Sequence, residues 1–390
     1  NPHQNPIPYT DQPAVAADPH ADTISHASWR GRPQGGQHAG GHGAIGSWAR
    51  TPLPVKRSLV PLLKTWLAAG EPIALATVVR VEGSAPSRPG ACMAVSSSGQ
   101  VAGALSGGCV DGAVCEEAQQ VLASGQPRRL VYRASETDDF EIGLACGGTL
   151  EVYVEPLSAL HRRALELLEA GQAFGLATEL GGGHLMAEPS GALEGDRSLA
   201  RDLLPLFPGP AAVLCEHEGQ AVFCAVYPPA PTLTIVGAVQ VAAALAGLAR
   251  VLGFRVRVVD PRRAFATRAR FPEVDELDVV WPQEALRAEA LGPDDYVVIL
   301  SHDPKLDLPA LEIALSSRAA YIGLIGARST QAERRRALAA AGFDPQALRR
   351  IHGPVGLDLG GREPEEIALA ILAEIVAVRH GRSGGMLSRP

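Results

Sequence analysis

Two short loops of this sequence each place a cysteine beside a pair of glycines. The residues concerned are Gly107, Gly108 and Cys109 in the first loop, and Cys146, Gly147 and Gly148 in the second. Flanking glycines leave a thiol uncovered and let backbone N–H groups point at a ligand. Because Cys109 also begins a predicted helix, the helix dipole favours its thiolate, which binds soft metals and carries sulfur. We therefore expect Cys109 and Cys146 to be functional thiols and the other four cysteines to be packing residues.

A second motif lies in the C-terminal half, between a predicted strand and a predicted helix. Residues 237–242 read Gly-Ala-Val-Gln-Val-Ala, and Asp260 ends the following strand, 23 residues after Gly237. This order of elements, with its terminal acid, is typical of a dinucleotide site. However, the second glycine of that motif is here Val239, whose branched side chain would crowd a pyrophosphate. Two interpretations stay open: a nucleotide site that includes Gly237, Gln240 and Asp260, or a Rossmann-like domain without tight dinucleotide binding.

A histidine and two arginines complete the set of candidate binding residues. His302 follows a buried strand and could act as a general base or a ligand, and Arg328 follows the next strand and could bind a phosphate or a carboxylate. Each could instead be a turn or helix-start residue. Because parallel strands end at one edge of a sheet, we expect both residues beside Gly237, in a crevice for an anionic ligand. Arg88, in the turn 83–90, could hold a phosphate or lie in a surface loop.

The elements that must position the cysteine loops form an α+β pattern. Helices are predicted over 59–69, 109–123 and 159–170, and strands over 73–81, 91–96, 100–105, 129–133, 149–154, 173–180 and 220–227. Between the last two strands we expect a loop rich in Gly and Glu, which makes 158–230 an irregular extension. The Pro-rich run 228–231 is the clearest linker in the chain.

After this linker, short apolar strands alternate with amphipathic helices. Strands are predicted over 233–236, 255–259, 296–300 and 320–325, and helices over 241–252 and 364–378. This alternation is typical of a doubly wound parallel sheet. The fold class is therefore α/β, with an N-terminal α+β domain over 57–228 and a Rossmann-like domain over 232–382. Residues 1–56 have no apolar periodicity and are predicted to be a disordered tail.

Composition limits the function further. The chain has 390 residues and a formal net charge of −7, which argues against a sequence-independent nucleic-acid binder. No apolar run is long enough to cross a membrane, and no signal peptide is recognisable, so we expect a cytoplasmic protein with reduced cysteines. Five of the eleven histidines lie in the tail, without the regular spacing of metal ligands.

The motifs together resemble those of the xanthine dehydrogenase accessory proteins of the XdhC/CoxI type. In the N-terminal half the resemblance lies in residues 76–86, 89–90, 101–110 and 146–151. In the C-terminal half it lies in residues 258–262, 321–326 and 356–367. The segments follow the family's order from about residue 58 to 382. Members usually carry Gly and His where this chain has Val239 and Gln240, a difference that bears on any nucleotide role.

The resemblance implies a molybdenum-cofactor chaperone. Such proteins bind the molybdopterin cofactor, support its sulfuration by a cysteine desulfurase, and deliver it to xanthine dehydrogenase or a related molybdenum hydroxylase. Cys109 and Cys146 would then contact the cofactor's molybdenum, and the crevice with Arg328 would suit the anionic pterin phosphate. The leading expectation is a non-catalytic carrier, which could form a homodimer. The alternatives are an NAD(P)-dependent oxidoreductase and a scaffold that recruits the desulfurase without holding cofactor.

Overall fold

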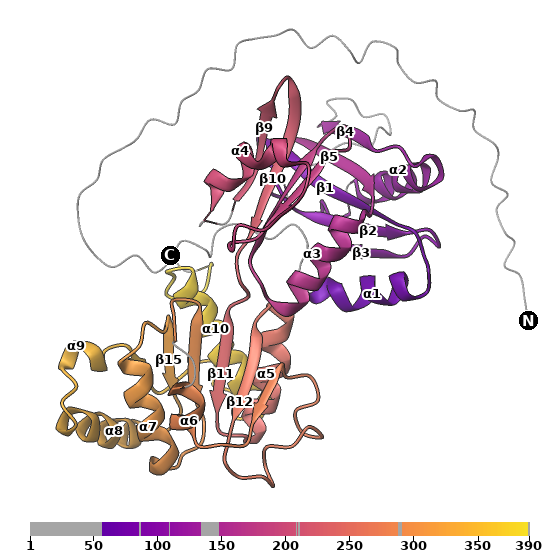
Figure 1. The fold of residues 1–390 in the computed structure, drawn as a ribbon. Coiled ribbons are helices and arrows are strands. Elements are labelled where there is room, and N and C mark those ends of the chain that lie inside the picture. Colours follow the sequence, from indigo (N-terminus) through magenta and orange to yellow (C-terminus); the bar gives the residue numbers. More distant parts are fainter. Residues whose placement is uncertain are drawn as a thin grey trace, which may run out of the picture. The chain divides into compact units, whose positions relative to one another are not determined.

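The computed structural model describes residues 57–388 apart from residues 86, 109, 134–147, 208, 210 and 288–290. All structural statements below concern these described residues. The predicted disordered tail lies outside them, as do Cys109, Cys146 and Gly147. Figure 1 draws the three sheets around which the described chain is built.

The first sheet carries the elements that flank both cysteine loops. Its strand order is β3-β2-β1-β5-β4, and every neighbouring pair is antiparallel. The strands are β1 (Ile73–Glu82), β2 (Cys92–Ser96), β3 (Val101–Gly103), β4 (Arg128–Arg133) and β5 (Thr149–Pro156). Two helices accompany them, α1 (Val60–Ala68) and α2 (Asp111–Ser124). The predicted strands and helices of this part are therefore present, within a few residues of their expected ends.

A second antiparallel sheet occupies the segment that was expected to be irregular. Its order is β8-β7-β6-β10-β9. The strands are β6 (Phe174–Glu179), β7 (His184–Ala187), β8 (Leu193–Gly195), β9 (Ala211–His217) and β10 (Gln220–Tyr227). The helix α3 (Ala159–Ala170) leads into it, and α4 (Ala200–Leu203) lies between β8 and β9. The expectation of a loop over 181–219 was wrong, because β7 and β8 pair through backbone hydrogen bonds that need no long apolar run.

The two antiparallel sheets share one hydrophobic core. Residues of β1 and β5, such as Leu75 and Tyr153, are buried together with residues of β6 and β10, such as Phe174 and Phe223, and with one face of α3. On its other face, the first sheet buries Ala76, Val78 and Val152 against α2. Successive side chains of β1 and β5 point to opposite faces of the sheet, so each of these strands contributes residues to two cores.

The third sheet is wholly parallel and has the order β13-β12-β11-β14-β15-β16. Its strands are β11 (Thr232–Val236), β12 (Arg255–Val259), β13 (Glu276–Asp278), β14 (Asp295–Ile299), β15 (Tyr321–Leu324) and β16 (Ile351–His352). The helices are α5 (Gln240–Val251), α6 (Pro282–Arg287), α7 (Pro304–Leu315), α8 (Arg328–Ala340), α9 (Pro345–Leu348) and α10 (Pro364–Arg379). Helices α5 and α10 bury one face of the sheet, and α6, α7 and α8 bury the other, so the predicted doubly wound fold is confirmed.

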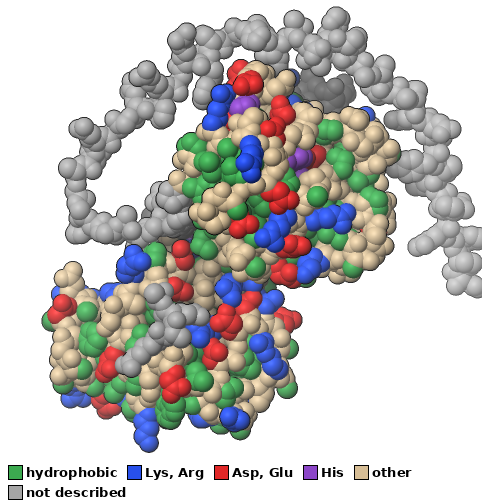
Figure 2. Space-filling model, viewed as in Figure 1, with side chains coloured by type: hydrophobic (Ala, Val, Ile, Leu, Met, Phe, Trp, Pro, Cys, Tyr) green, Lys and Arg blue, Asp and Glu red, His purple; other side chains and the backbone are tan. Residues whose placement is uncertain are grey.

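The surface of the described residues carries both signs of charge. Figure 2 shows acidic and basic side chains interspersed over the face in view, without a large field of either sign. None of the described helices is both long enough and apolar enough to cross a bilayer.

Candidate functional site

The parallel sheet places four of the predicted binding residues at one edge. Strand β11 lies between β12 and β14. The chain adds β12 and β13 on one side of β11 and then returns to add β14, β15 and β16 on the other side, which creates a switch point. In such sheets ligands bind outside the carboxyl ends of the strands at this point. Gly237 follows β11, Asp260 follows β12, His302 follows β14 and Arg328 follows β15. The structure therefore brings these residues to a common edge, as the sequence predicts.

Gly237 makes the tight turn at the centre of this edge. Its φ is +106°, and a Cβ at this position would lie 2.8 Å from the backbone nitrogen of Ser301. Val239 has an ordinary φ of −89° and precedes Gln240, the first residue of α5. The turn therefore needs glycine at its first position for conformation and for space, whereas its third position fits a branched residue without strain.

Asp260 is buried and bonded within the protein on both carboxylate oxygens. One oxygen accepts from the backbone N–H of Ala238 at 2.7 Å, and the guanidinium of Arg262 donates to both oxygens at 2.6 and 2.8 Å. Burial by itself raises the pKa of Asp260, but these hydrogen bonds outweigh it and hold the pKa below the ordinary value. The acid thus holds the turn and Arg262 in place, with its side chain fully shielded from solvent.

His302 is exposed and has a backbone conformation that few residues other than glycine adopt. Its φ is +59°. The neighbouring Asp303 accepts a hydrogen bond from the backbone N–H of Lys305 and thereby caps α7. A non-glycine residue held in the left-handed region points to a local requirement for the side chain, because the conformation costs free energy. His302 follows β14 and therefore lies at the same edge of the sheet as Gly237.

A buried network beneath His302 was not found from the sequence. The hydroxyl of Ser301 donates to Asp307 at 2.5 Å, and the guanidinium of Arg334 donates to the other Asp307 oxygen at 3.2 Å. All three side chains are buried. Burial is the main reason that the pKa of Asp307 lies above its ordinary value. The network fixes the loop after β14 to α7 and α8, and the 27 residues between Asp307 and Arg334 leave no spacing signal for it.

Arg328 stands at the last strand end of this edge. Gly326 has a φ of +125°, which turns the chain from β15 into α8, and Arg328 is the exposed first residue of that helix. Arg262, about one-third exposed, provides a second guanidinium after β12. The edge therefore offers two arginines, an exposed imidazole and a tight glycine turn, which is a donor set that suits an anionic ligand.

In the N-terminal region, one carboxylate organises the first cysteine loop. Asp111 accepts hydrogen bonds from the backbone N–H groups of Leu105 at 2.8 Å, Ser106 at 3.2 Å and Gly108 at 2.6 Å. Gly107 and Gly108 are exposed and have φ values of +72° and +119°. The conformation of residues 105–108 is therefore set by Asp111, a residue type that is common at helix starts.

The turn that contains Arg88 is attached to this loop. The hydroxyl of Ser87 donates to the carbonyl oxygen of Leu105. At the same end of the sheet, Gly148 lies so close to the 82–84 backbone that a Cβ there would be 2.4 Å from the carbonyl oxygen of Ser84. The structure thus brings together the Arg88 turn, the Gly107–Gly108 loop and Gly148. The thiols of Cys109 and Cys146 lie outside the described residues.

The four remaining cysteines occupy the interior or its border. Cys92 and Cys224 are buried, and Cys115 and Cys215 are half-buried. Burial raises the pKa of the Cys92 thiol to about 12. Such a thiol stays protonated at neutral pH and is therefore a poor nucleophile and metal ligand.

The sequence matches two family models. One, described as the XdhC Rossmann domain, covers residues 233–375, and the other, described as the XdhC and CoxI family, covers residues 66–133. These matches include the Gly237 edge in the first case and the Gly107–Gly108 loop with Arg88 in the second.

Known proteins resemble the chain along most of its length. It is 30% identical over 334 residues to a probable xanthine dehydrogenase subunit of Bacillus subtilis (strain 168), with 82% of this chain and 96% of that protein covered. It is 26% identical over 315 residues to the molybdenum cofactor insertion chaperone PaoD of Escherichia coli (strain K12), with 80% and 85% covered. A crystal structure described as a xanthine dehydrogenase from Bacillus halodurans superimposes with a TM-score of 0.69 at 28% identity, covering 86% of this chain and 98% of that one. With this extent of similarity to its relatives, the chain belongs to the XdhC and CoxI family.

Proposed function

We propose that this chain is an accessory protein that binds molybdenum cofactor, supports its sulfuration and delivers it to xanthine dehydrogenase or a related molybdenum hydroxylase. The observation that carries the proposal is the match over both halves of the chain to a protein named as a molybdenum cofactor insertion chaperone. The match to a probable component of xanthine dehydrogenase supports the class of client enzyme. In this proposal the cofactor is cargo, and the protein itself performs no turnover.

The sheet edge at Gly237 supports the binding of an anionic pterin phosphate. Arg262 and Arg328 would supply charge-assisted hydrogen bonds, and the amino end of α5 adds a partial positive charge. An NAD(P)-dependent oxidoreductase would use the acid after β12 for a ribose hydroxyl. Here both oxygens of that acid, Asp260, are engaged by the Gly237 turn and by Arg262. The geometry therefore favours the carrier over the oxidoreductase.

The loops at Gly107 and Gly148 support a second contact between the protein and the cofactor, made by cysteine sulfur. In the proposal Cys109 and Cys146 act as thiolates that approach the molybdenum while its oxo ligand is exchanged for a sulfido ligand. A cysteine desulfurase would supply the sulfur, and a homodimer would present the thiols of both copies. The Asp111 hydrogen bonds support this role, because they hold the loop before Cys109 open at two exposed glycines.

The direct test is molybdenum and pterin analysis of protein purified from a host that makes the cofactor. We expect stoichiometric cofactor in the wild type and at least about a tenfold weaker retention in Cys109→Ala and Cys146→Ala, because each loses a thiolate ligand. Cys115→Ala, a change in a half-buried cysteine of α2, is the matched control and should retain cofactor normally.

Two results would contradict the proposal. If both Cys109→Ala and Cys146→Ala bind cofactor and activate the client enzyme like the wild type, the thiols have no role. If calorimetry of the purified chain gives micromolar affinity for NAD(H) or NADP(H), the oxidoreductase is the better assignment. If protein purified from the cofactor-making host captures the desulfurase but contains no cofactor, the scaffold is favoured instead.

A further inference from the structure

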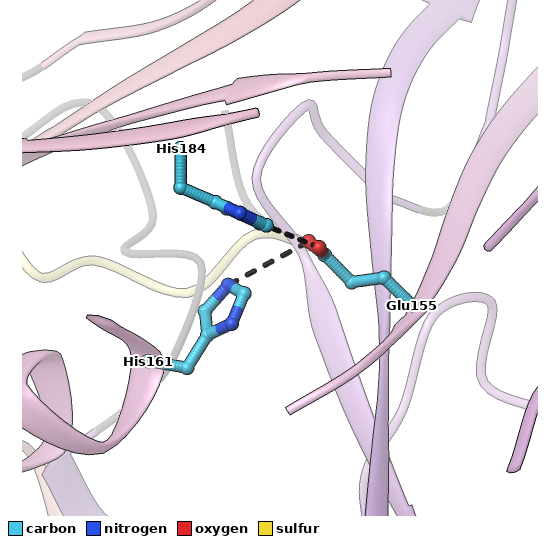
Figure 3. Close-up of side chains that lie close together, drawn as sticks. All are labelled: Glu155, His161 and His184. Atoms are coloured by element: carbon cyan, nitrogen blue, oxygen red, sulfur yellow. Dashed lines mark hydrogen bonds and ion pairs between the residues drawn. The ribbon is translucent and has the colours of Figure 1, made fainter. Parts of the chain in front are cut away.

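Three metal-ligating side chains converge inside the N-terminal region, apart from the loops described above. Figure 3 shows His161 and His184 approaching the carboxylate of Glu155 from different sides. The Nε2 atom of His184 lies 2.6 Å from one carboxylate oxygen, and the Nε2 atom of His161 lies 3.5 Å from the other. The three ligand atoms lie within 4.8 Å of one another. Two imidazoles and a carboxylate form a donor set that first-row transition metals such as zinc accept.

The three residues come from three different elements. Glu155 belongs to β5 in the first antiparallel sheet, His184 to β7 in the second, and His161 to α3, the helix that joins them. Glu155 and His161 are buried, and the His184 side chain is 13% exposed. An ion bound by all three would therefore link both sheets and the connecting helix at one point.

A small cavity with an unpaired polar group adjoins the cluster. Its volume is about 30 Å³, and Tyr153, Glu155 and His161 are among its lining residues. The Tyr153 hydroxyl is fully buried and has no hydrogen-bond partner among the described residues. Buried hydroxyls are nearly always paired, and a cavity of this size holds about one water molecule. A metal-bound water in the cavity would give Tyr153 its missing partner.

Charge also favours an ion at this position. Glu155 forms its ion pairs with the two histidines. A buried carboxylate is costly to desolvate, and a divalent cation held between it and the two imidazoles would compensate its charge.

We propose that Glu155, His161 and His184 form a structural site for a divalent transition-metal ion, zinc in the first instance, with a water in the adjoining cavity as the fourth ligand. Tetrahedral zinc places its ligand atoms about 3.4 Å apart at bond lengths near 2.0–2.1 Å. The His184–Glu155 pair widens to admit the ion, and the hydrogen on each Nε2 moves to Nδ1. The site does not depend on the proposed cofactor function.

Binding of the ion at Nε2 would exchange one hydrogen bond of His161 for another. Its Nδ1 lies 2.9 Å from the hydroxyl of Ser158 and 3.1 Å from the Ser158 backbone nitrogen. Without the ion, Nδ1 accepts from that N–H and closes the capping box of α3. With the ion, Nδ1–H donates to the Ser158 hydroxyl, the outer hydrogen bond that metal-ligating histidines usually make, and the Ser158 backbone N–H loses its ring acceptor.

The test is equilibrium dialysis of the chelator-treated full chain against zinc, with the metal measured by mass spectrometry. We expect His184→Gln and Glu155→Gln each to bind one equivalent less than the wild type, or to bind that equivalent at least about tenfold more weakly. His217→Gln is the matched control, because His217 is also buried against a carboxylate, Asp202 at 2.6 Å, but belongs to no described metal-binding group. The tail histidines and the cysteines contribute equally to all four proteins.

A cobalt spectrum keeps the test decisive if a variant folds poorly. The difference between the cobalt spectra of the wild type and of His184→Gln should show the visible bands of low-coordinate cobalt without a sulfur-to-cobalt charge-transfer band. Equal stoichiometry in the wild type and both cluster variants would overturn the site. The same cobalt spectrum in the wild type and in both cluster variants, or no tightly bound equivalent in the wild type, would overturn it too.

Discussion

Glu374, on α10, shows how one half-buried acid secures the end of the parallel sheet. It accepts hydrogen bonds from the Tyr321 hydroxyl at 2.7 Å, the Gly356 backbone N–H at 2.7 Å and the His352 ring at 3.1 Å. Burial by itself raises the pKa of Glu374, but the three donors outweigh it and hold the pKa below the ordinary value of 4.5. The carboxylate form is therefore favoured by folding.

Tyr321→Phe should make the stability of the protein less dependent on acid pH. Removing the hydroxyl takes away one donor and should lower the free energy of unfolding by about 1–1.5 kcal/mol at pH near 7. A lowered carboxyl pKa stabilises the fold above the unfolded-state pKa, and this contribution is lost as pH falls through the folded-state pKa. Urea denaturation should therefore show a difference from the wild type that shrinks between pH about 5 and about 3. A constant difference over this range would contradict the assignment.

At this scale the sequence predicts which residues stand at strand ends but not what they bond to. Gly237, Asp260, His302 and Arg328 lie at the expected edge because the end of a buried strand is visible as the end of an apolar run. The engagement of Asp260 by Arg262 depends on side-chain packing, which a linear pattern does not contain. For the Glu155 cluster of the N-terminal region the sequence does hold a signal, since Glu155 lies two residues after the core residue Tyr153 and therefore on the same face of β5.

Among the elements, the β11–α5 connection is the most constrained by a single residue. Gly237 combines a positive φ with close contact to the backbone after β14. Gly247, in the exposed face of the following helix, has neither constraint, since a Cβ there would meet nothing within 4 Å. The two glycines of one βα unit thus have opposite requirements.

Gly237→Ala and Gly247→Ala should change stability in opposite directions. The first change places a Cβ 2.8 Å from the Ser301 nitrogen and should cost at least about 1–3 kcal/mol. The second change reduces the conformational entropy that the backbone loses on folding, and it should stabilise the protein by about 0.5–1 kcal/mol. Denaturant unfolding of both variants measures the two effects. Destabilisation by Gly247→Ala, or tolerance of Gly237→Ala, would show that the βα unit packs differently.

Elements with long apolar runs could be predicted, and short paired strands could not. The parallel strands β11, β14 and β15 are buried on both faces, so each reads as a largely apolar run close to its true position. Strand β9 is mostly half-exposed, and β8 has three residues that include a glycine. Such strands are defined by pairing to a neighbour, which sequence periodicity does not report.

Over the whole molecule, a net charge of −7 must be reconciled with an anionic cargo. Because the opposite charges are interspersed, attraction has to come from arginines close to the bound phosphate, within about 10 Å at ordinary ionic strength. Arg328 at the carboxyl edge of the sheet meets this condition. Arg349, exposed after α9, lies toward the amino edge, where the neighbouring Arg350 bonds the end of α7.

Arg328→Gln should weaken cofactor binding by about tenfold and reduce its dependence on salt. The change removes one charge-assisted hydrogen bond to phosphate, and with it one of the charges that salt screens. Arg349→Gln changes the net charge equally but should bind like the wild type. Titrations at low and high NaCl measure both effects. Equal weakening of the two variants would mean that overall charge, rather than the Gly237 edge, governs binding.

The position of β1 has a consequence for synthesis of the chain. Ala74 in this strand pairs with Val95 of β2 on one side and with Pro156 of β5 on the other. A nascent chain can form the first pairing early, but the second edge of β1 stays unpaired until α2, β4 and all of β5 have left the ribosome. An open strand edge readily pairs with another chain. The sheet that carries both cysteine loops is therefore exposed to misassembly between neighbouring nascent chains, whereas the parallel sheet, whose β11 and β12 are neighbours in both sequence and space, begins to close at once.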